Sequence, residues 1–188
     1  MLQGQYRLVF FLIMCVLGTS WLLYQHQSKP KTHKAINELL EEYMYNVQVE
    51  NFDTEGALVQ NLQAHYWAFV PKEGRSLLEH PEVTVFKKDN THWILQAQKG
   101  QAFHEHLAVT PHHIEFWDKV ILRRTGNETS PMELQTEQLS YFPEKKFAES
   151  KQYVTLTKPG TRITGHGLKA YLDKGQVELL QDVTTYYE

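Results

Sequence analysis

The C-terminal residues Ile163 to Tyr187 alternate apolar and polar side chains in two runs separated by a turn. The first run ends at Leu172, the tripeptide Asp173-Lys174-Gly175 suits a tight reversal, and apolar residues return at odd positions from Val177. A period of two places every second side chain on the same face of a strand. The pattern predicts a β-hairpin with one apolar face, and a single hairpin of this kind is too small to be stable alone.

Weaker relatives of this unit occur earlier in the chain, each with an alternating triplet followed at a similar spacing by a valine. The pairs are Leu62-Gln63-Ala64 with Val83, Leu95-Gln96-Ala97 with Val120, Leu134-Gln135-Thr136 with Val154, and Ile163-Thr164-Gly165 with Val183. Hairpins that repeat along a chain bury their apolar faces by stacking on one another. We therefore interpret most of the chain as a ladder of antiparallel hairpins.

From residue 43 onward no helical pattern exceeds a few residues. The first strand begins there, with Tyr43, Tyr45, Val47 and Val49 predicted on one face. Further strands are predicted at 58–70, 77–86 with a break near Pro81, 92–98, 103–109, 114–124, 132–141, 147–156 and in the final hairpin, with a bend at Gly100. Many short strands with regular turns predict an all-β fold: a sandwich, a jelly roll or a slab of antiparallel sheet.

The segment from Leu8 to Tyr24 carries no charge and is just long enough to cross a bilayer as a helix. A signal peptide cleaved after Ser20 is the first alternative, but the apolar run continues beyond Trp21. Lipidation at Cys15 is the second, and the large Met14 before it disfavours that reading. We expect an uncleaved transmembrane anchor.

The predicted organisation has three parts: an N-terminal tip and anchor at 1–27, a linker at 28–42, and a β-domain at 43–188. Helical spacing at 34–43 indicates either a short amphipathic helix or a solvated connector, and the sequence leaves both open. Arg7 precedes the anchor and three lysines follow it closely, so the distribution of charge does not settle the orientation in the membrane.

The charge and the histidines argue against two classes of function. Acidic residues number 22 against 19 basic ones, the opposite of what a phosphate-binding surface for nucleic acid needs. His104-Glu105-His106 places two imidazoles on one face of a predicted strand, but the chain has no recognisable third ligand or positioned base. We expect no metal, no cofactor and no catalytic residue.

Several motifs together resemble the lipopolysaccharide export family LptC over about residues 47–188. They are Asn51 to Leu58, Leu62 to Tyr66, His80 to Asp89, Trp93 with Ala97 and Gly100, Val154-Thr155-Leu156, Gly167-Leu168-Lys169-Ala170 and Val183 to Glu188. Their order and spacing behind one N-terminal apolar segment carry the resemblance. The chain departs from the family between Thr157 and His166, where it is slightly long, and in its N-terminus, which is poor in basic residues.

This resemblance implies a Gram-negative inner-membrane protein with a cytoplasmic N-terminus and a periplasmic, twisted antiparallel β-jellyroll of the OstA/LptA-like slab type. Such proteins accept lipopolysaccharide from the ATP-driven transporter LptBFG and pass it to periplasmic LptA. An unpaired edge strand can template a strand of a second protein. We expect the transmembrane helix and the N-terminal edge to meet LptBFG, and the C-terminal edge to dock LptA through Val183, Thr184, Thr185, Tyr186, Tyr187 and Glu188.

Period-two counting nominates the side chains that line an acyl groove between the sheets, although ordinary core packing explains each of them equally well. They are Val47, Leu78, Val85, Leu95, Leu134, Leu172, Val177, Leu179 and Tyr187; of these Val47, Leu78, Val177 and Tyr187 match positions where the family's ligand contacts are expected. At the rim Lys87, Lys88, Arg123 and Arg124 can meet lipid phosphates or simply be solvated. Gly56 and Gly160 are predicted turn formers whose replacement by a bulky residue misaligns neighbouring strands.

Two other classes of function stay open. A membrane-anchored structural or assembly module would have the same fold without binding lipid. A histidine-dependent periplasmic hydrolase would lose its activity on substitution of His104 or His106.

Overall fold

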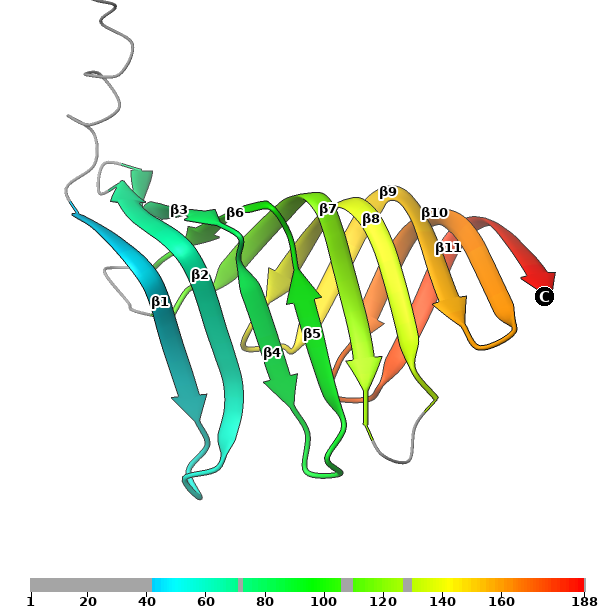
Figure 1. The fold of residues 1–188 in the computed structure, drawn as a ribbon, viewed down its shortest axis with the longest axis horizontal. Coiled ribbons are helices and arrows are strands. Elements are labelled where there is room, and N and C mark those ends of the chain that lie inside the picture. The colour runs from blue at the N-terminus through cyan, green and yellow to red at the C-terminus, as the bar shows by residue number, and fades with distance from the viewer. Residues whose placement is uncertain (1–41, 71–72, 106–109, 127–129, 188) are drawn as a thin grey trace, which may run out of the picture. The chain divides into compact units, whose positions relative to one another are not determined.

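The computed structural model describes residues 42–70, 73–105, 110–126 and 130–187. Within these ranges the chain forms eleven β-strands, and every strand pairing is antiparallel (Figure 1). The described residues contain no helix that is long and apolar enough to span a membrane. The predicted anchor at 8–24 lies outside the described residues, as does all of the possible helix at 34–43 except Glu42 and Tyr43, which are in a strand.

The strands follow one another along the chain with short connections. They are β1 (Glu42–Phe52), β2 (Leu58–Val70), β3 (Arg75–Glu79), β4 (Glu82–Phe86), β5 (His92–Gln96), β6 (Lys99–Phe103), β7 (His113–Thr125), β8 (Met132–Phe142), β9 (Phe147–Lys158), β10 (Thr161–Tyr171) and β11 (Gln176–Tyr187). The all-β antiparallel prediction is confirmed. The break near Pro81 is also confirmed, since β3 ends at Glu79 and β4 begins at Glu82.

The predicted bend at Gly100 is wrong, and the strand predicted at 103–109 does not include His104 and Glu105; residues 106–109 lie outside the described residues. The strand is β6 and ends at Phe103, so Gly100 lies inside it. A Cβ atom at Gly100 would lie 3.0 Å from the carbonyl oxygen of Glu115 and 3.1 Å from Cγ of Pro81. The glycine therefore permits a close approach of neighbouring strands, which a sequence pattern does not separate from a turn.

The strands form one sheet whose order is β11-β10-β9-β8-β7-β5-β4-β2-β3-β6, with β1 paired to β2 and β6 also paired to β7. The long strands β2 and β7 each divide their pairing between two sets of short strands. β2 pairs with β4 through its first half and with β3 through its second half, while β7 pairs with β6 and then with β5. The β3–β6 pair and the β4–β5 pair therefore belong to different halves of a folded sheet.

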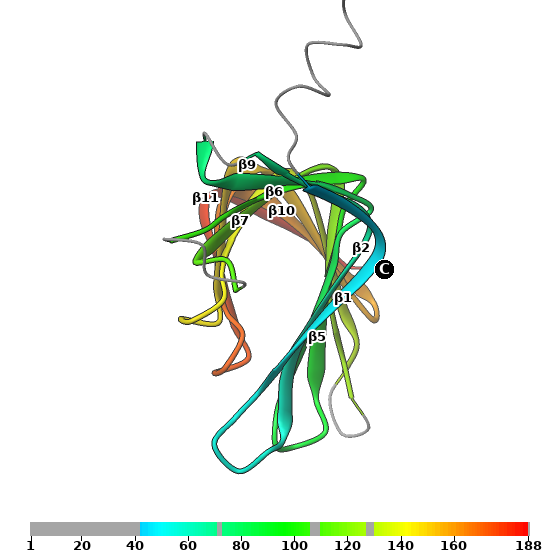
Figure 2. The same ribbon diagram turned by 90° about the vertical axis from the view of Figure 1, so that its left-hand side faces the viewer.

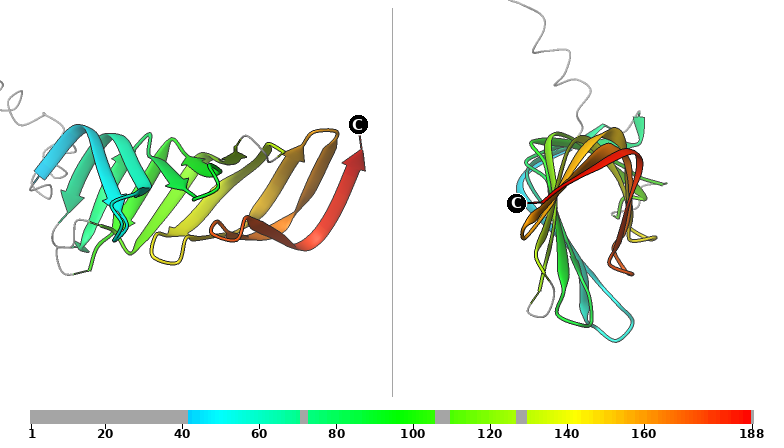
Figure 3. Two further views of the ribbon diagram at one scale, coloured as in Figure 1. Left: turned by 90° about the horizontal axis from the view of Figure 1, so that it is seen from below. Right: turned by 90° about the vertical axis from the view of Figure 1, so that its right-hand side faces the viewer.

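A line of backbone irregularities in mid-strand marks where the sheet folds over. Non-glycine residues with positive φ occur at Asn46 in β1, at Asp118 and Lys119 in β7, and at Asp182 in β11, and Gly167 in β10 has a φ of 76°. The pairing shifts register at or beside these positions in β7 to β11. Bulges bend a strand and increase its twist. We call this line the crease (Figures 2 and 3).

The crease also explains why period-two counting assigned the wrong face to part of β1. Val47 and Val49 are partly buried and pack on the core, whereas Tyr43 and Tyr45 are exposed. The positive φ of Asn46 lies between the two pairs. The prediction that all four side chains share one face is therefore wrong, because a residue with positive φ inside the strand resets the alternation that period-two counting assumes, with no shift in the β1–β2 register at this point.

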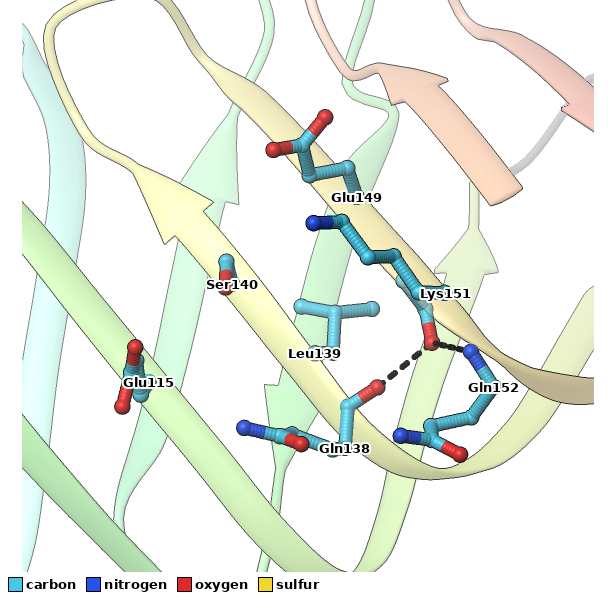
Figure 4. Close-up of a pocket in the computed structure, with 8 residues that line it drawn as sticks. Glu115, Gln138, Leu139, Ser140, Glu149, Lys151 and Gln152 are labelled. Atoms are coloured by element: carbon cyan, nitrogen blue, oxygen red, sulfur yellow. Dashed lines mark hydrogen bonds between the residues drawn. The ribbon is translucent and has the colours of Figure 1, made fainter. Parts of the chain in front are cut away.

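Buried hydroxyl groups satisfy backbone groups that the crease leaves unpaired. Ser150 Oγ donates to the carbonyl oxygen of Gln138 at 2.6 Å and accepts from the amide of Gln152 at 3.1 Å (Figure 4). Thr136 Oγ1 lies 3.2 Å from Ser150 Oγ and donates to the carbonyl oxygen of Tyr153 at 3.0 Å. Buried polar groups need such partners, so these two side chains make the bend tolerable inside a packed sheet.

The predicted turn formers and the repeat find partial support. Gly56 and Gly160 have φ values of 81° and 69°, the left-handed region that suits glycine. Of the four repeat pairs, Leu62 is the registered partner of Val83, and Val154 is the partner of Thr136 at the end of its triplet. The effect of replacing either glycine stays a prediction.

Five aromatic rings form a continuous row on the outer face, at one end of strands β6 to β10. His113 stacks between Phe103 and Phe142, with ring centroids 5.1 and 4.8 Å away, and the row continues through Phe147 to Tyr171. Nε2 of His113 is buried without a hydrogen-bond partner. Burial, opposed in part by Glu115, holds the pKa of His113 below its ordinary value of 6.5.

We predict that His113 makes the fold sensitive to acid. Since its pKa is lower in the folded chain than in the unfolded one, its contribution is fully present above pH 6.5 and is lost as the pH falls below that value. His113→Phe keeps the stack and removes the proton site. Urea unfolding at several pH values should show a smaller loss of stability on acidification in the variant than in the unaltered protein. An equal loss in both would contradict this role.

Candidate functional site

The two halves of the folded sheet face each other across a seam. We call the half containing β4 and β5 the β4–β5 wall and the half containing β3 and β6 the β3–β6 wall. Side chains from the two walls interleave to form the core, and Trp93, Tyr141 and Phe116 are the largest that are fully buried. Apolar faces that meet in this way supply the main driving force for folding.

Two hydrogen bonds cross the seam in its middle. Trp93 Nε1 donates to the carbonyl oxygen of Leu172 at 3.0 Å, and the hydroxyl of Tyr141 donates to Oε1 of Gln60 at 3.4 Å. Burial raises the pKa of the Tyr141 hydroxyl above its ordinary value, so this group remains a donor. The middle of the seam is thus closed by packing and by satisfied polar groups.

Most predicted lining residues lie in this closed part of the seam. Those that are no more than 2% exposed are Leu78, Val85, Leu95, Leu134 and Leu172. Val47 is partly buried near the N-terminal edge and packs against the core. The structure therefore places these six side chains on the inner face, where their contact with a ligand stays a prediction.

At the C-terminal end the seam holds a cavity of about 260 Å³. Val177 and Leu179 are partly buried and line it, as predicted for the inner face. Its lining consists of Arg124, Met132, Leu156, Lys158, Ile163, Gly175, Val177, Leu179 and Val183. We call this space the seam cavity. Six of its nine lining residues are apolar, and its position next to the edge strand β11 places it at an end of the sheet.

Sequence reasoning missed Ile163 and Val183 as lining residues although both occur in the repeat. Gly165 lies beside Val183 in the structure: a Cβ atom there would lie 3.5 Å from Cγ2 of Val183. The register shift between Thr164 and His166 changes which face the following residues occupy. Glycines at 165 and 167, so close together inside one strand, were the available signal of this bulge.

β11 pairs with β10 along one side, which makes it the C-terminal edge of the described sheet. The side chains of Val183, Tyr186 and Tyr187 are 51%, 54% and 84% exposed. Tyr187 pairs with Thr161 at the very end of the strand, so it is far more open than the other predicted lining residues. Glu188, the last residue of the predicted partner edge, lies outside the described residues.

The histidines do not form a metal centre in the described part of the chain. Among the residues described, no group of three or more His, Cys, Asp or Glu side chains lies close enough to hold a metal ion. Nε2 of His104 lies 3.0 Å from Oγ of Ser76, a contact within the sheet. His106 lies outside the described residues.

Two polar hollows lie on the outer face beside the crease. One, of about 300 Å³, is bordered by Glu115 and Glu149 from strands on either side of β8 (Figure 4). The other, of about 420 Å³, is bordered by Lys119, Glu137 and Tyr153 among others. Hydrocarbon gains little beside the first hollow, where seven of the eight bordering residues are polar. The seam cavity is the better candidate for an apolar ligand.

Comparison with known proteins points to lipopolysaccharide export. Residues 8–188 match the family described as "LptC: Lipopolysaccharide-assembly, LptC-related". The fold is similar to the crystal structure of LptH from Pseudomonas aeruginosa, described as the LptA homologous periplasmic component of the conserved lipopolysaccharide transport device. The TM-score is 0.51 with 8% sequence identity, over 69% of this chain and 94% of that one. A search of curated proteins found no match.

Proposed function

The chain belongs to the LptC-related family of lipopolysaccharide-assembly proteins and has a role in lipopolysaccharide transport; from this premise we propose that it accepts lipopolysaccharide from the transporter LptBFG and passes it to periplasmic LptA. The observation that carries the proposal is the apolar seam cavity beside the edge strand β11. In this proposal residues 8–24 anchor the protein in the inner membrane, and the β-domain works in the periplasm.

The physical basis of the proposal is the exchange of one apolar surrounding for another. Each CH₂ group transferred from water to an apolar surrounding contributes about 0.8 kcal/mol, so an acyl chain in the seam would escape into water slowly. Transfer of the acyl chain to a second protein is faster when the groove of that protein continues the seam, because the chain does not have to enter water. The seam cavity opens beside the strand where a second sheet can add, which provides that continuity.

The closed middle of the seam sets a condition on this transport. Leu78, Leu95 and Leu134 are packed in a continuous core, so a chain that passes between them must displace their contacts. An acyl chain is a hydrocarbon, like the leucine side chains whose contacts it replaces. The leucines therefore stay in apolar surroundings when the chain enters. In this proposal lipid enters the seam by separating the walls rather than by filling an existing tunnel.

A photoreactive residue at Val177 or Leu179 should form adducts with lipopolysaccharide in cells. Both side chains line the seam cavity, while Glu178 between them is exposed and pairs with Lys169 on the opposite face. Crosslinking followed by immunoblotting for lipopolysaccharide measures this difference. Adducts at 177 and 179 but not at 178 or 169 are expected.

The same experiment separates transport from a purely structural role. Photoreactive residues at Val47, Leu78 and Tyr187 extend the crosslinking experiment along the inner face. Absence of adducts at every inner site, with the protein folded and in the membrane, would favour an assembly module without lipid. Equal adducts at inner and outer sites would mean that the protein lies near lipid without a defined groove.

Removal of residues 183–188 should abolish binding of LptA. Residues 183–187 form the end of the edge strand, and an added strand needs their free backbone groups. Affinity capture of LptA by the full-length and the shortened protein measures the effect, and thermal unfolding checks that the rest of the sheet is intact. LptA bound equally by the shortened protein would refute the docking edge.

A further inference from the structure

Arg124 occupies an unusual position at the rim of the seam cavity. It lies on β7 as the partner of Trp93 on β5 and Met132 on β8, both of which are buried in the core. Its guanidinium carbon lies 5.7 Å from the centroid of the Trp93 ring. Nη1 donates to the carbonyl oxygen of Gly175 in the β10–β11 turn at 3.2 Å. The side chain therefore reaches from the β4–β5 wall to the turn at the other side of the cavity.

The charge of Arg124 has no acidic partner among the described residues. Nη1 and Nη2 donate to the neutral carbonyl oxygens of Gly175 and Ser130, at 3.2 and 3.3 Å, and Nε is buried without a hydrogen-bond partner. A partly buried guanidinium in this state has lost hydration without gaining an anion, which is costly unless a ligand supplies one.

A second uncompensated cation lies nearby. Lys158 lines the seam cavity together with Arg124 and forms no ion pair with the described residues. Glu133, next in sequence to the lining residue Met132, is already bonded to Arg123 at 2.6 Å, which lowers the pKa of that carboxyl. The side chains of Arg124 and Lys158 therefore keep a net positive charge at the rim.

The two cations lie where two cavities adjoin. A second cavity of about 570 Å³ lies at the ends of the β7–β8 and β9–β10 connections. It shares Arg124, Met132 and Lys158 with the seam cavity, so the two spaces adjoin at these side chains. A phosphate group held by the cations at this boundary would leave the acyl chain of the same amphiphile in the seam cavity.

From this arrangement we infer that Arg124 and Lys158 bind a phosphate group of the amphiphile whose acyl chain occupies the seam cavity. The inference rests on the proposed function and adds the polar half of the ligand to it. The planar guanidinium matches phosphate oxygens through two parallel hydrogen bonds, and Nη1 and Nη2 each carry a second N–H beyond those donated to Gly175 and Ser130. The ammonium group of Lys158 adds a second, more flexible contact.

The test compares two probes on the full-length protein in a non-ionic detergent: lipid A with its phosphate groups and the same lipid after phosphatase treatment. Arg124→Gln and Lys158→Gln should each weaken binding of the phosphorylated lipid about tenfold, as expected for loss of a hydrogen bond to a charged group. Neither substitution should change binding of the dephosphorylated lipid. Fluorescence titration at low and high salt measures both, and salt should reduce the difference.

Lys169→Gln is the matched control, because it removes the same charge from the outer face, where Lys169 pairs with Glu149 and Glu178. Lys158 is exposed, so its substitution tests the site even if Arg124→Gln disturbs folding through the lost contact with Gly175. Equal affinity of all variants for both lipids would overturn the phosphate site and leave the acyl groove intact. Absence of binding by the unaltered protein would overturn both. Inorganic phosphate bound as tightly as the lipid would overturn assignment to an amphiphile.

Discussion

The fold depends on the crease that lets one sheet bury its own apolar face. An unbent sheet of these strands would expose one wall of Leu, Val and aromatic side chains to water. Positive φ at Asp118, Lys119 and Asp182 and the bulge around Gly167 turn the strands so that the walls meet. The backbone groups released there are held in part by Thr136 and Ser150. Strain at the crease is thus offset by burial along the seam.

The seam is not uniform, and its variation relates structure to function. Around Trp93 and Tyr141 it is packed and carries hydrogen bonds from wall to wall. Toward β11 the side chains become smaller or more exposed, and the seam cavity appears between Ile163 and Leu179. A carrier needs both properties, because a rigid core holds the walls together while a loosely packed end admits ligand. Arg124 bonds to the turn beyond that end.

Alternation in the sequence was sufficient to predict the sheet, the hairpin at Asp173-Lys174-Gly175 and the inner-face position of Leu134 and Leu172. It was insufficient where a residue with positive φ changes the phase, as at Asn46 and at Gly167, because period-two counting carries no information on backbone dihedrals. Arg124 was noticed as a rim charge, but its link to Gly175 depends on folding across the seam, between segments remote in sequence. The position of a residue along its strand can be predicted from neighbouring residues, whereas its contacts on the opposite wall depend on segments far away in the sequence.

The central claim is that the two walls separate to admit hydrocarbon, and a distance across the cavity tests it most directly. Spin labels at positions 157 and 174 would lie near the end of β9 and on the β10–β11 turn, next to Lys158 and Gly175 that line the seam cavity, with Cys15 replaced so that only these sites react. Pulsed electron–electron double resonance would then measure the distance between the two labels with and without lipopolysaccharide. The account predicts a longer distance when lipid is bound. An identical distribution at saturating lipid would contradict it.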